Sequence, residues 1–161
     1  MRLCKSLKKG QKMDAFAKLA NLKILLVDDD PFIRDAMTLA FKQKKFSLCT
    51  AETAEEGLEA MHEETFDIII CDFKLPGISG LMFLKQAVVS QPGSIKLLIS
   101  AFSSDEMVSE AYRIGVHDFL QKPFTVETLL ATLLMHLGKE KQQKSSIIAN
   151  TILATPKNSG I

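Results

Sequence analysis

The sequence has only three cysteines in 161 residues, Cys4, Cys49 and Cys71, and their spacing matches no metal-binding motif. An odd number of scattered thiols suits a reducing compartment better than a disulfide framework, so we expect a cytoplasmic location. No apolar run approaches the ~20 residues that a membrane-spanning helix needs. The first residues also lack the apolar core of a signal peptide, so we expect neither secretion nor membrane insertion.

The chain lacks an excess of charge of one sign, because 20 lysines and arginines balance 19 aspartates and glutamates. No global field is therefore available to attract nucleic acid or anionic lipid. Five basic residues are concentrated in the first stretch of the chain, at Arg2, Lys5, Lys8, Lys9 and Lys12. Because no aromatic residue is interleaved with them, we interpret this arm as a solvated tail, and we expect no direct DNA binding.

The sequence does contain a fivefold alternation of short apolar runs with segments of helical periodicity. This pattern predicts an α/β fold with a five-stranded parallel sheet and crossover helices. Right-handed crossovers leave few arrangements, and we adopt the flavodoxin-like doubly wound (βα)5 order 2-1-3-4-5. The expected strands are residues 23–27, 48–51, 67–71, 96–99 and 118–121.

Start and stop signals flank the expected helices. Capping boxes, in which a serine or threonine and a glutamate satisfy each other's backbone donors, are expected at Thr53 with Glu56 and at Ser103 with Glu106. The last helix is expected to run over residues 126–137 and to end at Gly138.

The length allows one well-packed domain with a short arm at each end. We expect a basic N-terminal arm at residues 1–22, with a short helix around residues 14–20, and the α/β domain at residues 23–138. The C-terminal tail, residues 139–161, is too short and irregular for a helix-turn-helix domain, so we expect no output domain.

Polar residues follow the expected strands at their carboxyl ends. Asp28 and Asp29 follow the first strand, Asp72 the third, Ser100 the fourth and Lys122 the fifth. In the order 2-1-3-4-5 the first and third strands are neighbours, and ligands bind in the crevice at their carboxyl ends. Three carboxylates gathered there repel one another, and a hard divalent cation such as Mg²⁺ relieves the repulsion because it prefers oxygen ligands.

Four segments together resemble the receiver domains of two-component response regulators. They are LLVDDDP at residues 25–31, IIICDFKLPGISG at 68–80, LLISAFS at 97–103 and FLQKPF at 119–124. Their order and spacing fit that family over roughly residues 23–138. The resemblance implies a phosphoacceptor signalling domain rather than an enzyme, one that promotes only its own phosphorylation and dephosphorylation.

The resemblance also implies roles for the residues of the site. Asp72 would accept the phosphoryl group, and Lys122 would pair with its charge. Mg²⁺ would bind Asp29 and Asp72 directly, Asp28 mainly through water, and the backbone carbonyl of Lys74.

A conformational switch is implied by the same resemblance. Ser100 would hydrogen-bond the phosphoryl group and, with Phe119, change the surface of the fifth strand and the last two helices. Pro123 would follow a cis peptide bond. Phe102 and Lys74 flank the acceptor by position, and we expect them to slow loss of the phosphoryl group unless both side chains point to solvent.

The partners implied are a phosphoryl donor and a protein target. The donor would be a histidine kinase, a phosphotransfer protein or a small acyl phosphate. The switch surface would bind the downstream target, and it is also the candidate surface for a homodimer.

Two alternatives stay open at this point. A degenerate receiver would act as a phosphorylation-independent interaction module, although the intact acidic set argues against it. A haloacid-dehalogenase-like phosphatase also carries an Asp-x-Asp motif after its first strand, as Asp28 and Asp30 do here. However, Pro31 does not continue that motif, and no late acidic pair supplies its second metal-binding arm.

Overall fold

The computed structural model describes residues 16–153, with side chains through Lys139. Its parallel sheet has the order β2-β1-β3-β4-β5, which confirms the predicted fold class and topology. The strands are β1 (Lys23–Val27), β2 (Ser47–Ala51), β3 (Ile68–Asp72), β4 (Ile95–Ser100) and β5 (Asp118–Gln121). The helices are α2 (Pro31–Gln43), α3 (Ala54–Glu63), α4 (Gly80–Ser90), α5 (Asp105–Arg113) and α6 (Val126–Leu153). Residues 16–20 are also helical.

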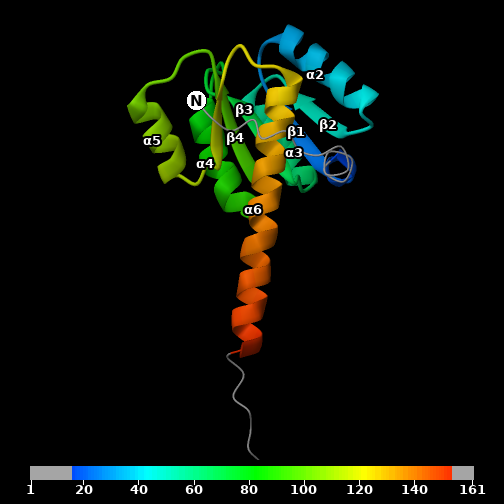
Figure 1. Ribbon diagram of the computed structural model, residues 1–161. Coiled ribbons are helices and arrows are strands. Elements are labelled where there is room, and N and C mark those ends of the chain that lie inside the picture. The colour runs from blue at the N-terminus through cyan, green and yellow to red at the C-terminus, as the bar shows by residue number, and fades with distance from the viewer. Residues whose placement is uncertain (1–15, 154–161) are drawn as a thin grey trace, which may run out of the picture.

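The sheet is covered by helices on both faces (Figure 1). Successive side chains of a strand point to opposite faces, so the central strand contributes to two cores. Ile68 and Ile70 of β3 pack with α2 and α6, whereas Ile69 and Cys71 pack with α3, α4 and α5. Every residue of β3 is buried, as the run of β-branched residues predicts for a strand between two helical layers.

The helix caps agree only in part with the predicted signals. Thr53 caps α3, and its side chain accepts a hydrogen bond from the Glu56 backbone N–H at 3.2 Å. The prediction of Ser103 as a cap is wrong, because Ser104 is the N-cap of α5, and its side chain accepts a hydrogen bond from the Met107 N–H at 3.2 Å. With this start, the two acidic residues that follow Ser104 both lie in the first turn, where the helix dipole favours them.

The predicted end of the last helix is also wrong. α6 passes through Gly138 without a break and continues to Leu153. A single glycine costs a helix only about 1 kcal/mol, and good helix formers stand on both sides of this one. Figure 1 shows the later part of α6, in orange and red, projecting away from the sheet. None of the helices in residues 16–153, α6 included, combines the length and apolar character that crossing a bilayer requires.

Candidate functional site

The carboxyl ends of β1 and β3 bring three carboxylates together. The two strands pair in parallel with Val27 opposite Cys71, so the residue that follows each one emerges at the same edge of the sheet. Asp28, Asp29 and Asp72 each place a carboxylate oxygen within 4.8 Å of the others. The structure therefore assembles the acidic cluster that the strand order predicts.

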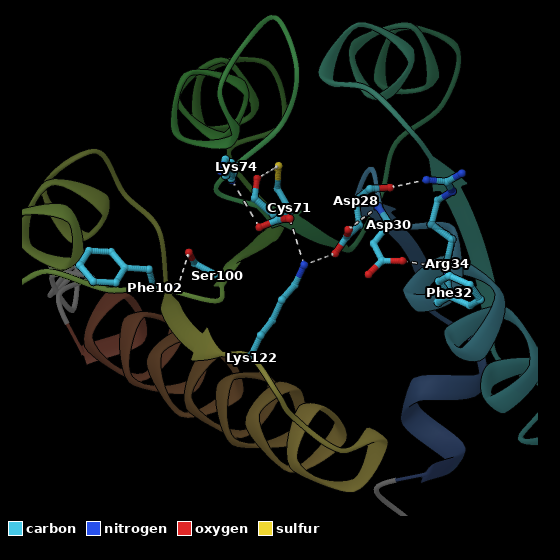
Figure 2. A network of polar contacts seen from close by, with 10 residues as sticks. Asp28, Asp30, Phe32, Arg34, Cys71, Lys74, Ser100, Phe102 and Lys122 are labelled. Carbon is cyan, nitrogen blue, oxygen red and sulfur yellow. Dashed lines mark hydrogen bonds and ion pairs between the residues drawn. The ribbon is translucent and has the colours of Figure 1, made fainter.

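Lys122 enters this cluster from the end of β5 (Figure 2). Its Nζ lies 2.9 Å from Asp28 Oδ2 and 3.0 Å from Asp72 Oδ2, so one ammonium group bridges two carboxylates. Partial burial lowers the pKa of Lys122, but its contacts with both carboxylates outweigh burial and raise the pKa above its usual value. Lys122 is therefore a cation at neutral pH.

Asp28 is completely buried, and its two carboxylate oxygens differ in their partners. Oδ1 accepts a hydrogen bond from the Asp30 backbone N–H at 2.9 Å. Oδ2 lies beside Lys122 but accepts no well-directed hydrogen bond within residues 16–139. Burial raises the pKa of Asp28, against the opposing effect of Lys122. A buried oxygen with an unused lone pair, next to two further carboxylates, fits a hard divalent cation such as Mg²⁺.

Asp72 ends β3 and keeps 6% of its surface exposed, unlike Asp28. Its Oδ1 accepts from the Lys74 N–H at 3.3 Å, which directs the carboxylate toward the turn after the strand. The preceding residue, Cys71, donates its thiol hydrogen to the Asp72 backbone carbonyl at 3.2 Å. Burial raises the pKa of Cys71 well above its usual value, so this residue is an unreactive thiol.

Arg34 of α2 contacts the backbone beside the acidic cluster, a role that was not predicted from the sequence. Its Nη1 donates to the backbone carbonyl of Asp28 at 2.7 Å, and its Nη2 pairs with Glu52 Oε2 at 3.0 Å (Figure 2). The guanidinium therefore ties the turn after β1 to the turn after β2. The sequence offers one signal for this contact: Arg34 stands one turn into the helix that follows the acidic residues 28–30.

The residues expected to form the switch lie farther from the carboxylates. Ser100 is buried, and its Oγ accepts from the Phe102 N–H at 3.2 Å. Phe119 is half-buried and packs against the core under α3, α4 and α5. The Lys122–Pro123 peptide bond is cis, as expected. Phe102 is 75% exposed, and its ring points away from Lys122 in Figure 2, so it does not shield the site in this conformation.

A five-stranded doubly wound sheet with three acids and a lysine at its carboxyl edge defines a class of α/β signalling domains, and comparison with known proteins identifies the family. The model of the response regulator receiver domain matches residues 24–134. The chain therefore belongs to the response regulator receiver domain family, whose members serve two-component systems.

Individual relatives agree with this assignment. The chain is 31% identical over 113 residues to the transcriptional regulatory protein ZraR of Escherichia coli, which covers 70% of this chain and 26% of ZraR. It is 30% identical over 126 residues to the DNA-binding transcriptional regulator NtrC of Klebsiella pneumoniae, covering 76% of this chain and 27% of NtrC. The chain thus spans about a quarter of the length of these relatives.

Solved structures give the same result. A CheY-like receiver domain protein from Methanospirillum hungatei superposes with a TM-score of 0.72 at 29% identity, covering 76% of this chain and 99% of that one. The BeF3-activated DrrB receiver domain gives a TM-score of 0.66 at 31% identity, covering 73% of this chain and 97% of that one. The match covers almost the whole length of both neighbours, so this chain resembles complete receiver domains.

Proposed function

We propose that the chain accepts a phosphoryl group on Asp72. The observation that carries this proposal is the position of Lys122 Nζ, 2.9 Å from Asp28 and 3.0 Å from Asp72. Asp28 is completely buried and cannot meet a donor, whereas Asp72 reaches the surface beside the same cation. The donor would be a phosphohistidine of a histidine kinase or phosphotransfer protein, or a small acyl phosphate. An Asp72 oxygen attacks phosphorus, and the bond from phosphorus to nitrogen or to the acyl oxygen breaks.

The remaining polar residues have roles in this reaction. Asp28, Asp29, Asp72 and the backbone carbonyl of Lys74 would hold Mg²⁺, which neutralises charge on the transferred phosphoryl oxygens. The Lys122 ammonium pairs with one phosphoryl oxygen, and Ser100 Oγ–H donates to another.

Phosphorylation would act as a switch, because it adds nearly two negative charges and three acceptor oxygens. Ser100 moves toward the phosphoryl group and Phe119 fills the space so released. This shifts a pre-existing equilibrium of the surface formed by α5, β5 and α6. We propose this surface as the contact for a downstream protein and as the candidate homodimer interface.

The 20 basic and 19 acidic residues of the chain leave no global field that would attract DNA. We propose a cytoplasmic protein that acts on a protein target, without binding DNA directly and without inserting into a membrane. It is not an enzyme for an external substrate, since the site acts only on its own Asp72.

Intact-protein mass spectrometry after incubation with acetyl phosphate and Mg²⁺ tests the proposal. The wild type should gain one phosphoryl group, Asp72→Asn none, and omission of Mg²⁺ should suppress labelling. Asp35→Asn, which removes an exposed carboxylate from α2, is the matched control and should label fully. Full labelling of Asp72→Asn would refute the assignment. No labelling of the wild type, even by kinases, would favour the degenerate receiver.

A further inference from the structure

Asp29 differs from the other two carboxylates of the acidic site in what holds it. Asp28 and Asp72 both contact Lys122, and each also accepts a hydrogen bond from a backbone N–H. The Asp29 side chain is exposed, and it forms no hydrogen bond or ion pair with any residue that the structure describes. The direction of the Asp29 carboxylate therefore depends on the backbone that carries it.

This backbone is fixed at the residue before Asp29. The Asp28 N–H donates to the Ala51 carbonyl at 3.1 Å, where the pairing of β1 with β2 ends. The Asp28 carbonyl accepts from Arg34 Nη1 at 2.7 Å (Figure 2). That carbonyl and the Asp29 N–H belong to one planar peptide group, so a contact that holds the oxygen also fixes the direction in which the chain enters Asp29.

The Arg34 guanidinium is itself held in place. Its Nη2 pairs with Glu52 Oε2 at 3.0 Å, and the arginine side chain is only 17% exposed. Glu52 is fixed in turn, because its backbone N–H donates to Glu56 Oε2 at 2.8 Å in the first turn of α3. A planar guanidinium with donors engaged on both sides cannot rotate without breaking one of its contacts. Arg34 thus links the start of α3 to the peptide group before Asp29.

We propose that Arg34 is a positioning residue for the binding of a divalent cation. By holding the Asp28 carbonyl, it directs the Asp29 carboxylate toward the other two carboxylates. The inference rests on the Mg²⁺ site of the proposed function. Arg34 is not a ligand, because a guanidinium has no lone pair to offer a cation. Removing a group that orients a metal ligand typically lowers metal affinity by roughly 10–100-fold.

The positive charge of Arg34 would have the opposite effect on the same site. A guanidinium beside the carboxylates repels a second cation. If Arg34 acted through its charge alone, its removal would therefore tighten the binding of Mg²⁺. If Arg34 directs Asp29, its removal weakens that binding. The sign of the change in Mg²⁺ affinity separates the two roles.

An NMR titration of the full chain with MgCl₂, followed through its backbone amide signals, tests this proposal without any phosphoryl donor. Arg34→Met should raise the dissociation constant for Mg²⁺ about tenfold. Arg34→Lys keeps the charge, but a single ammonium cannot reproduce the planar fork that reaches two acceptors, so this variant should also bind Mg²⁺ more weakly. Arg113→Met is the matched control, since it removes an exposed arginine and its ion pair with Glu110 on α5. The control should bind Mg²⁺ like the wild type.

Other results would overturn the proposal. Tighter or unchanged Mg²⁺ binding by Arg34→Met, with the dispersed amide signals of a folded chain, would contradict it. Wild-type affinity in Arg34→Lys would contradict it as well, and this variant decides the question if Arg34→Met does not fold. Equal weakening in Arg113→Met would show that the effect is not specific to Arg34. A wild type that binds no Mg²⁺ would overturn the metal site of the proposed function, and this inference with it.

Discussion

Gly80 lies so close to Asp72 that a Cβ atom on Gly80 would stand 1.8 Å from the Asp72 backbone carbonyl oxygen. The Gly80 N–H also donates to the carbonyl of Phe73 at 3.0 Å. The first residue of α4 therefore rests directly on the end of the strand that carries the candidate acceptor. Only a residue without a side chain permits this contact.

Replacing Gly80 with alanine should therefore damage both stability and the acceptor. Because the clash is with backbone, which cannot swing aside, we expect the free energy of unfolding to fall by about 3 kcal/mol or more. Urea unfolding measures this change. Gly93→Ala is the control, since a Cβ there meets nothing within 4 Å. If the free energy of unfolding falls no more in Gly80→Ala than in Gly93→Ala, α4 can shift to accommodate the added methyl group, and the prediction is wrong.

Asp28→Asn should stabilise the metal-free protein. The raised pKa of Asp28 means that folding disfavours its charged form, so the carboxylate costs stability at every pH above its folded pKa. Removing that charge should increase the free energy of unfolding at neutral pH by roughly 1–2 kcal/mol. Added Mg²⁺ should stabilise the wild type more than the variant. A destabilised Asp28→Asn in chelator-treated buffer would mean that the Lys122 contact outweighs burial.

His117 should make stability depend on pH. The imidazole Nδ1 of His117 accepts a hydrogen bond from the Lys96 backbone N–H at 3.1 Å, and the backbone N–H of His117 donates to the Lys96 carbonyl at 2.9 Å, just before the first residue of β5. An Nδ1 that accepts a hydrogen bond must be unprotonated. Burial lowers the pKa of His117, and the charges of Lys96 and His136 lower it further.

The sign of the pH effect follows from this lowered pKa. Above about pH 6.5 His117 is neutral in both the folded and unfolded states. As the pH falls below that value, the unfolded state binds a proton first, so stability decreases until the pH reaches the folded pKa. Urea unfolding between pH 8 and pH 5 should show less decline in His117→Asn, which keeps an acceptor, than in wild type. His62→Asn, which changes an exposed histidine, controls for the loss of one titratable group.

Lys45→Gly should stabilise the fold. The φ of +59° is strained for lysine but not for glycine, although glycine makes the unfolded chain more flexible. The net gain in the free energy of unfolding should be about 0.5–1 kcal/mol. Lys45→Ala keeps the strain and should give no gain.

The strands and the acidic cluster could be predicted because they depend on local patterns and on one topological rule. The buried isoleucines of β3 identify a central strand, and neighbouring carboxyl ends then bring Asp28 and Asp72 together. Contacts that depend on how a helix lies on the sheet could not be predicted. Arg34 reaches the Asp28 carbonyl because of where α2 lies on the sheet, and Gly138 does not end α6 because the helix formers on both sides of it outweigh the small cost of one glycine. Residues 14 and 15, the start of the expected short helix, lie outside the described residues.

Because α6 is one continuous helix, a small tilt at its first residues would displace its last residues by a large distance. It begins at Val126, four residues after Lys122, and ends at Leu153. At 1.5 Å per residue the helix is about 40 Å long, so a tilt of about 10° at its start moves its far end by roughly 7 Å. A slight rearrangement beside Lys122 that tilts α6 would therefore move the end of the helix by more than the rise of one helical turn, about 5.4 Å.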